Sequence, residues 1–194
     1  MKKIILILSW LFIFNTVNAA ELNDKDVEKF INDMSKTSQS ILNNKSLSEK
    51  QRKKDYKDFS DKIVDSEWVA KFVLGNYWRQ INQKQQEEFL VLYRDYLLDN
   101  YMPKLEDYNK DINIQKIVKT KQYVFMVTTK TRDKTDRDIN VDFRLVEKDG
   151  KLFITDIIPE GISFIGNQRS DVGSSISNSG YDAFIKELRS KISK

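Results

Sequence analysis

The chain has 194 residues, enough for one compact domain, and it contains neither cysteine nor histidine. The missing histidine excludes Ser-His-Asp and Cys-His catalysis and removes the commonest metal ligand, while the missing cysteine excludes a disulfide framework. The formal net charge is +4, but it falls to +2 without Lys2 and Lys3, because 31 basic side chains then stand against 29 acidic ones. Basic and acidic residues are interspersed, which is typical of a solvated surface and not of a nucleic-acid-binding stripe.

Residues 1–19 have the layout of a secretory signal peptide. Met1-Lys2-Lys3 is a short basic start, Ile4 to Phe14 is almost wholly apolar, and Val17-Asn18-Ala19 places small residues at the −3 and −1 positions of a cleavage site. An uncleaved N-terminal anchor is the alternative, although the apolar run is short for a membrane span. We therefore expect an exported chain whose residues 20–194 form a single domain. No cysteine follows the apolar run to carry a lipid anchor, which in a diderm bacterium predicts a periplasmic protein.

Two amphipathic helices are predicted at the start of this domain. The first runs from Asn23 to Leu42, with apolar side chains on one face at 3.6-residue spacing and Asn23 or Asp24 as its cap. The second opens at Ser48 with a capping-box pattern, and its apolar stripe consists of Tyr56, Phe59 and Ile63. Both patterns are typical of helices that cover a core.

The stretch from Trp68 to Tyr108 carries more apolar surface than two covering helices need. A helix is predicted from Glu67 to about Ile81, and another from Asn82 to about Tyr101. Pro103 either ends this second helix or kinks it, with Leu105 and Tyr108 as its continuation. Gly75 lies in the middle of the first helix, where a glycine usually marks the close approach of another backbone or a ligand. Ordinary core packing uses the same residue types. Periodicity alone therefore leaves two interpretations, a plain core or the wall of a pocket for a large apolar ligand.

From Ile112 onward the apolar period changes from 3.6 to 2. Strands are predicted over Ile112–Val118, Gln122–Thr131, Ile139–Leu145 and Lys151–Ile158, with the hairpin signal Asp149-Gly150 before the last. Pro159 interrupts that strand, and Gly161–Ile165 is expected to extend it. A short helix capped at Ser170-Asp171 and a last helix from Tyr181 to Ile192 follow. This order predicts an α+β fold, with N-terminal helices packed on a curved antiparallel sheet of about four to five strands, cone-like and with an internal apolar cavity.

Few residues of the sequence stand in a pattern typical of metal binding or catalysis. Asp133 to Asp138 superficially resembles a calcium loop but lacks its central glycine and its terminal glutamate. Asp156 lies inside an apolar strand, where we expect it to cap or hydrogen-bond nearby backbone. In a second interpretation, a small-molecule isomerase or hydrolase-like enzyme on a cone-shaped fold would pair Asp156 with Tyr77, Tyr93 or Tyr101 as acid and base. A purely structural or adaptor protein is a third.

Six segments of the chain bear on its family. They are FVLGNYWR (72–79), QQEEF (85–89), YRDYL (93–97), IIPEGIS (157–163), QRSD (168–171) and GYDAFI (180–185). Jointly, in order and spacing, they resemble the MlaC family, also called the toluene-tolerance family, over nearly the whole mature chain. Pro159 is a departure, because small or polar residues are more usual at that position.

The resemblance implies a soluble periplasmic phospholipid carrier that is not an enzyme and needs no cofactor. Such a protein holds the acyl chains of a glycerophospholipid between helices and sheet. It ferries the lipid between an outer-membrane lipoprotein/porin complex and an inner-membrane ABC transporter complex, which maintains outer-membrane lipid asymmetry. We expect a monomer that binds no metal and no nucleic acid.

The resemblance does not say which side chains contact the lipid, so these are predicted from the apolar patterns. From the helices we predict Phe72, Val73, Tyr77, Trp78, Tyr93, Leu97 and Tyr101. From the sheet and its extension we predict Phe125, Val127, Val141, Phe143, Ile162 and Phe164.

Overall fold

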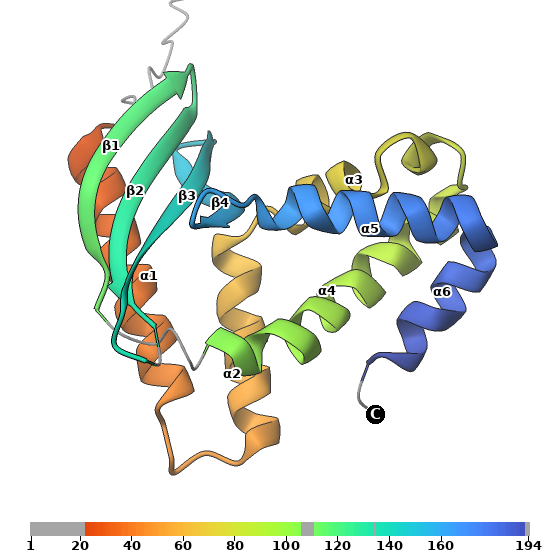
Figure 1. Ribbon diagram of the computed structural model, residues 1–194, viewed down its shortest axis with the longest axis horizontal. Helices are drawn as coiled ribbons and strands as arrows, with labels where there is room; N and C mark the ends of the chain where they lie inside the picture. The colour runs from red at the N-terminus through yellow and green to blue at the C-terminus, as the bar shows by residue number, and fades with distance from the viewer. Residues whose placement is uncertain (1–21, 106–110, 134, 193–194) are drawn as a thin grey trace, which may run out of the picture.

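The computed structural model describes residues 22–105, 111–133 and 135–192 (Figure 1). Its helices are α1 (Asp24–Leu42), α2 (Glu49–Ile63), α3 (Ser66–Leu74), the 3₁₀ helix η1 (Gly75–Arg79), α4 (Gln83–Leu105), α5 (Phe164–Ser179) and α6 (Tyr181–Ser190). Its strands are β1 (Asn113–Lys121), β2 (Val124–Arg132), β3 (Asp138–Lys148) and β4 (Lys151–Pro159). The predicted export signal, its cleavage site and Tyr108 lie outside these residues. Within the described ranges, no helix is both long and apolar enough to cross a membrane.

The four strands form one antiparallel meander in the order β1-β2-β3-β4. Alternation along the strands separates two faces, and the register places Val127 opposite Phe143 and Phe125 opposite Leu145. These four side chains are all at most 5% exposed, so they share the buried face. The expected α+β fold, with helices on an antiparallel sheet, is confirmed.

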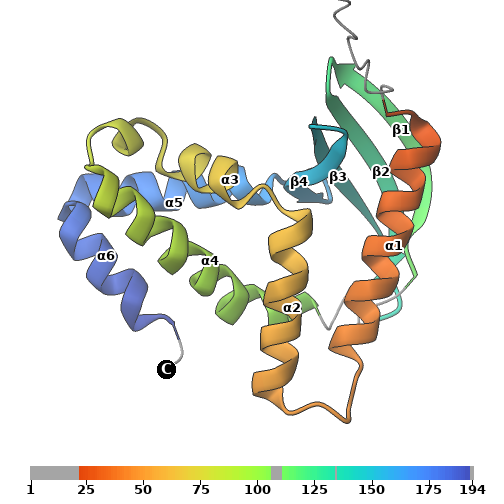
Figure 2. The ribbon, with the colours of Figure 1, turned by 180° about the vertical axis from the view of Figure 1, so that it is seen from behind.

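Helix α1 covers the buried face of the sheet (Figure 2). Asn23 caps it by accepting a hydrogen bond from the Lys25 amide, and the Asp26 carboxylate accepts one from the Asn23 amide in return. Val27 and Ile31 on its inner face are fully buried against the sheet. We call this assembly the sheet core, and its buried members are Val27, Ile31, Met34, Phe125, Val127, Phe143, Leu145, Leu152 and Ile154.

A second apolar core lies among the helices at the other end of the molecule. Helices α3, α4, α5 and α6 build it, and we call it the helical core. Its buried members are Val69, Ala70, Val73, Leu74, Phe89, Tyr93, Ile165, Val172, Ile176, Phe184, Ile185 and Leu188. The domain therefore has two apolar centres.

The helix predicted from Glu67 to Ile81 is divided in the structure. α3 ends at Leu74, because the φ of +55° at Gly75 breaks the α-helical path, and the short 3₁₀ helix η1 begins there. The next helix, α4, does not end at Pro103 but runs on to Leu105.

The predicted strand extension over Gly161–Ile165 is wrong, and so is the predicted start of the following helix at Ser170-Asp171. α5 already begins at Phe164, because the Ser163 hydroxyl accepts a hydrogen bond from the Gly166 amide at 2.9 Å. The buried Asp156 of β4 adds to this cap by accepting a hydrogen bond from the Ile165 amide at 3.2 Å. The helix start thus depends on a residue from the preceding strand.

Candidate functional site

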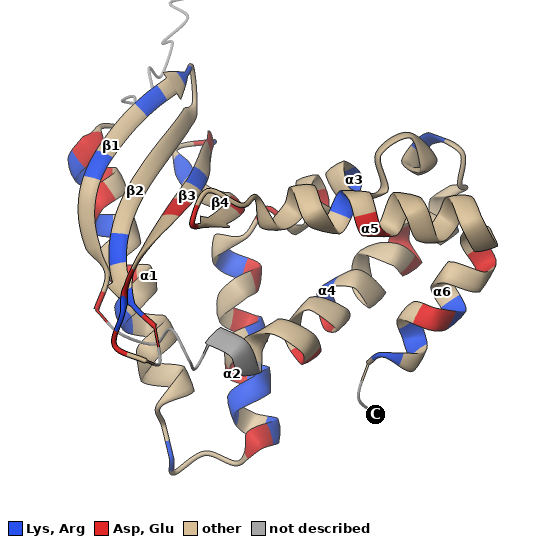
Figure 3. Ribbon diagram, viewed as in Figure 1, with Lys and Arg blue, Asp and Glu red and all other residues tan. Residues whose placement is uncertain are grey.

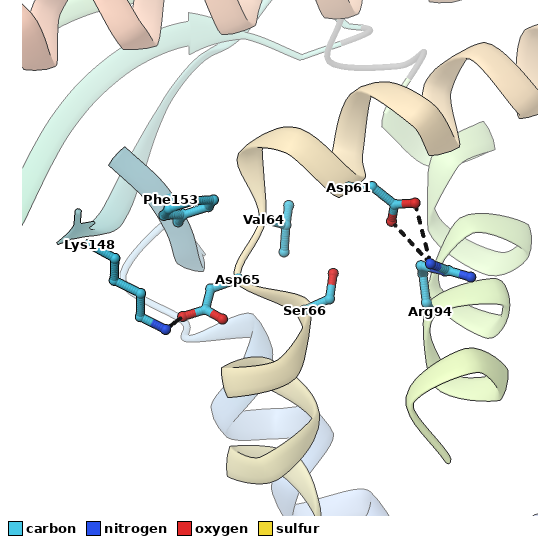
Figure 4. Close-up of a pocket in the computed structure, with 7 residues that line it drawn as sticks. All are labelled: Asp61, Val64, Asp65, Ser66, Arg94, Lys148 and Phe153. Carbon is cyan, nitrogen blue, oxygen red and sulfur yellow. Dashed lines mark hydrogen bonds and ion pairs between the residues drawn. The ribbon is translucent and has the colours of Figure 1, made fainter. Parts of the chain in front are cut away.

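The two cores meet where α2 turns into α3. Val64 in this turn packs against both cores, and it forms an isolated parallel bridge with Ile154 of β4. A pocket of about 390 Å³ lies at this meeting point (Figure 4). It is lined by Asp61, Val64, Asp65, Ser66, Arg94, Lys148 and Phe153. Because α2, α3, α4 and the β3–β4 hairpin all contribute, we call this region the seam.

Charged side chains surround the apolar floor of this pocket. Asp65 caps α3 through the Trp68 amide at 3.2 Å, and its carboxylate also binds the Lys148 ammonium at the end of β3. Asp61 of α2 faces Arg94 of α4, with 3.3 Å between a carboxylate oxygen and Nη1 (Figure 4). Val64 lies between these two pairs, and Phe153 lines the pocket on the side of Lys148 (Figure 4). The pocket therefore has a polar rim over apolar side chains.

A row of ion pairs joins α2 to α4 along the seam. Lys53 binds Asp99, and Lys57 binds Asp95 with 2.7 Å between Nζ and Oδ1. Together with Asp61 these lysines recur every four residues, so they share one face of α2. Arg94 also lies 3.8 Å from Asp95, which links the pairs into a network.

Apolar burial holds α2 less firmly than it holds α1, because no side chain of α2 is fully buried. Charge pairing with α4 is thus a principal attachment of α2 to the helical part, and Phe59 and Ile63 pack only partly buried against the sheet core. The site prediction from sequence omits these charged residues. The repeat of Lys53, Lys57 and Asp61 at i, i+4 spacing was the available signal.

Two of the predicted helical residues, Tyr93 and Tyr101, come together around a buried glutamine. The Tyr93 hydroxyl donates to Gln168 Oε1 at 3.2 Å, and Gln168 Nε2 donates to the Tyr101 hydroxyl at 2.8 Å. The Tyr101 ring meets Phe164 edge-on with 4.7 Å between centroids. Burial raises the pKa of Tyr93 well above its usual value, so this hydroxyl stays neutral. Val73 is buried in the same core and Leu97 packs against it.

Phe72, Tyr77 and Trp78 pack partly buried against the helical core. The Phe72 ring stacks on Trp68 at 5.1 Å, and the Arg169 guanidinium lies 4.9 Å from its centroid. Arg169 also donates to the Phe72 carbonyl. Tyr77 lines an open groove of about 640 Å³ along α5 beside Arg169, and Trp78 lies 5.5 Å from the Lys71 ammonium.

The close approach expected at Gly75 is made by the Arg169 side chain. A Cβ at Gly75 would lie 2.7 Å from Arg169 Nη2, inside any normal contact distance. A group does lie close to this glycine, but it is a side chain and not the backbone or ligand that the sequence analysis expects.

Four of the six residues predicted from the sheet and its extension lie in the sheet core. Phe125, Val127 and Phe143 are buried under α1, and Val141 packs partly buried at the margin of the sheet core. Ile162 is 57% exposed on the turn between β4 and α5, outside both cores. Phe164, predicted from the strand extension, instead opens α5 and packs against the helical core. The predicted site residues that lie in a core are thus divided between two cores, with the seam between them.

Asp156 has the structural role that the sequence analysis expects. Its carboxylate accepts hydrogen bonds from the Ser163 hydroxyl at 2.7 Å and the Ile165 amide at 3.2 Å, and Arg144 lies 3.9 Å away. The hydroxyls of Tyr93 and Tyr101 are engaged by Gln168 instead. The Asp156 carboxylate and the two tyrosine hydroxyls thus take part in separate hydrogen-bonded groups.

The loop at Asp133 is closed by its own residues. The Asp133 carboxylate accepts hydrogen bonds from the hydroxyl and amide of Thr135 and from the Arg137 side chain. The Thr135 hydrogen bond, above all, holds the pKa of Asp133 well below its usual range. Among the residues that the structure describes, no three carboxylates, histidines or cysteines gather as a metal site.

The sequence model of the MlaC protein family matches residues 21–190. The chain belongs to the MlaC family. Membership supports phospholipid binding and lipid transport, and it points to a binding or carrier protein rather than to an enzyme.

Among solved structures, the chain is similar to a phospholipid-binding protein from Ralstonia solanacearum that was determined in complex with a phospholipid. The match has a TM-score of 0.69 at 15% identity and covers 86% of this chain and 94% of that one. It shows that the two proteins share the MlaC fold. No curated protein matches the sequence significantly.

Proposed function

We propose that this protein is a periplasmic phospholipid carrier that holds acyl chains at the seam between the helical core and the sheet core. It takes a glycerophospholipid from one membrane complex and delivers it to another, between an outer-membrane lipoprotein/porin complex and an inner-membrane ABC transporter. The observation that carries the proposal is the MlaC family match over residues 21–190. The division of the apolar interior into two cores supports it.

The energetics of the cargo explain why an apolar seam is required. Two acyl chains contain roughly 30 methylenes, and exposing each to water costs about 0.8 kcal/mol, or about 25 kcal/mol in all. A carrier must therefore offer an interior about as apolar as the bilayer, yet not much more favourable, because release would then stall. Partly buried aliphatic and aromatic side chains on either side of the seam meet this requirement.

The ion-paired α2 offers a route for the chains to enter. Parting α2 from α4 breaks pairs such as Lys57–Asp95, but it uncovers no fully buried α2 side chain. Each partly exposed pair contributes up to about 1 kcal/mol, which is small beside the transfer energy of the lipid. Opening at the seam therefore leaves the buried centres of both cores packed.

In this proposal the lipid contacts the sides of the two cores that border the seam. Leu97, Tyr101 and Phe164 would contribute from the helical side, and Val141 and Phe143 from the sheet side. These residues belong to the set predicted from sequence. Ile162, also in that set, is exposed and lies outside both cores, so we assign it no contact with the lipid.

Native mass spectrometry of protein purified from a periplasmic extract tests the proposal. A mass increment that matches an intact phospholipid is expected. Val141→Arg and Phe143→Asp are expected to retain less lipid than Lys130→Glu, because Lys130 is exposed and pairs only with Asp138 in the described residues. Circular dichroism identifies any variant that fails to fold. Repeated absence of bound lipid in the folded wild-type protein would overturn the proposal.

A further inference from the structure

Two hairpin tips lie together at one end of the sheet. Consecutive antiparallel strands bring the β1–β2 tip at Lys121–Val124 and the β3–β4 tip at Lys148–Lys151 to the same end (Figure 1). The Glu147 amide donates to the Tyr123 carbonyl at 2.8 Å, which joins the two hairpins. They therefore present one continuous surface, which we call the tip surface.

Tyr123 at this surface is unusual in both conformation and exposure. Its φ of +65° falls in the left-handed region, which favours glycine and asparagine and is costly for an aromatic residue. Its side chain is nevertheless 46% exposed, and its hydroxyl contacts only the neighbouring Gln122 amide group, at 3.0 Å, among the hydrogen bonds of the described residues. Packing in the fold does not account for a tyrosine here. An outlier of this kind points to a role outside the fold.

Positive charge surrounds this tyrosine. Strand β1 carries Lys116, Lys119 and Lys121 and no carboxylate, as the blue bands in Figure 3 show. Lys151 adds a further cation on the neighbouring tip. Within the described ranges, Lys116, Lys121 and Lys151 have no ion-pair partner, whereas Lys119 lies 5.5 Å from the Phe125 ring.

The acidic groups nearby do not cancel this charge. Lys148 is paired with Asp65, so Glu147 and Asp149 are the remaining carboxylates of the β3–β4 tip, against the four cations Lys116, Lys119, Lys121 and Lys151. Asp149 is the exposed carboxylate on the β3–β4 tip, opposite several cations. The tip surface therefore has a net positive charge.

An uncovered sheet face continues this surface. Val118 lies opposite Met126 and Lys116 opposite Thr128, so both point away from the face that carries Phe125 and Val127. Figures 1 and 2 place α1 on that other face. Val118 is 37% exposed, and it stands between Lys116 and Lys121 on the same strand.

We propose that the tip surface, formed by Lys116, Val118, Lys121, Tyr123 and Lys151, docks the protein on an anionic phospholipid bilayer. Exposed tyrosine rings partition to the level of the lipid headgroups, and lysines near an anionic leaflet bind its phosphates. The two projecting hairpin tips can both contact a broad, deformable surface such as a bilayer. Two separated apolar side chains make less of an apolar centre than a stable protein–protein interface contains. An acidic protein surface is therefore the less favoured partner.

This inference goes beyond the proposed function and relies on it only for the choice of a phospholipid surface. Docking would bring the carrier to the membrane from which, or to which, lipid moves. It requires no lipid inside the seam, so the two proposals can fail separately.

Co-sedimentation with vesicles tests the docking surface. The purified protein is mixed with vesicles of phosphatidylcholine alone, or of phosphatidylcholine with about one third phosphatidylglycerol. We expect binding at least fivefold stronger to the anionic vesicles at low salt, and its loss at high salt, because salt screens the lysine–phosphate attraction.

Matched variants place the effect on the tip surface. Lys121→Glu combined with Lys151→Glu is expected to reduce binding to anionic vesicles at least fivefold. The control, Lys50→Glu with Lys186→Glu, makes the same change in net charge at exposed positions on α2 and α6 and is expected to bind as wild type. Tyr123→Asn suits the left-handed backbone and is expected to weaken binding without unfolding the hairpin.

Equal binding of the tip and control variants, or equal binding to both vesicle types, overturns the proposal. If the wild type sediments with neither vesicle, the bilayer is excluded and an acidic protein surface is the remaining partner. Native mass spectrometry of the tip variant separates the two proposals. Loss of vesicle binding with bound lipid retained supports docking as a distinct property, whereas vesicle binding by a protein that never carries lipid refutes only the carrier function.

Discussion

The Lys57–Asp95 ion pair provides the sharpest test of the seam as the entry route. Lys57→Glu removes one link between α2 and α4 and places a second negative charge beside Asp95. Lys57 is partly buried, so its substitution acts on the α2–α4 contact directly. If lipid leaves when α2 parts from α4, this variant is expected to release phospholipid faster than wild type.

The size of the effect follows from the geometry of the pair. The charged atoms lie 2.7 Å apart, and the two side chains are 32% and 30% exposed. A pair of this exposure contributes about 1 kcal/mol, and like-charge repulsion in the variant adds a fraction of that. Arg94, at 3.8 Å from Asp95, offsets part of the repulsion. A total of about 1–2 kcal/mol corresponds to release about 5–30-fold faster.

The assay follows a phospholipid with a fluorescent tail as it moves from the protein to an excess of empty vesicles. Lys54→Glu is the control, because Lys54 lies on the same helix and pairs with Asp58 of α2 itself at 2.7 Å. The charge swap Lys57→Glu with Asp95→Lys is expected to restore slow release, since it rebuilds the pair in reverse. Equal release by the Lys57 and Lys54 variants, or a swap as fast as the single variant, would refute entry at this seam.

Three local features of the helical part give further expected outcomes. Gly75→Ala should lower the free energy of unfolding by about 1–2 kcal/mol, because its φ of +55° strains any residue with a Cβ, while the flexible end of the Arg169 side chain can move aside. Thermal denaturation checks this against Gly173→Ala, where nothing lies within 4 Å, and equal melting temperatures would contradict it. Asp156→Ala should lower the free energy of unfolding, measured with urea, by about 2–4 kcal/mol, because it removes the buried hydrogen-bond acceptor at the start of α5. A decrease below about 1 kcal/mol would count against the role of Asp156 in this cap. Burial raises the pKa of Tyr181 to about 12, so the stability that this tyrosine contributes is full below pH 10 and is lost as the pH rises toward 12. The free energy of unfolding of Tyr181→Phe should therefore fall less steeply above pH 10 than that of the wild type. An unchanged pH profile of the free energy of unfolding would exclude this contribution.

Local signals in the sequence were sufficient to locate most of the elements. Asn23 and Ser48 cap the first two helices as the pattern predicts, through the amides of Lys25 and Gln51. The Asp149-Gly150 turn forms with φ values of +51° and +71°, as a tight hairpin requires. In each case the interaction joins residues only a few positions apart, so the information is contained in a short stretch of chain.

The segment from Gly161 to Ile165 shows where local signals fail. Its apolar residues alternate as in a strand, yet α5 begins at Phe164. Ser163 caps this helix, and the carboxylate of Asp156 supports the cap from β4 by accepting hydrogen bonds from the Ser163 hydroxyl and the Ile165 amide. A cap supplied across a turn by another element is invisible to a pattern that follows one segment.

What the sequence by itself determined is the family, the order of helices and strands, and the apolar character of the side chains proposed to hold lipid. Only the tertiary structure decided that Tyr93 and Tyr101 belong to one core and Phe125 and Phe143 to another, with the α2–α4 ion pairs along the seam between them. The physical reason is that periodicity tells which face of an element is apolar but not which other face it meets. That choice depends on how whole elements pack, and on charge pairs between residues tens of positions apart.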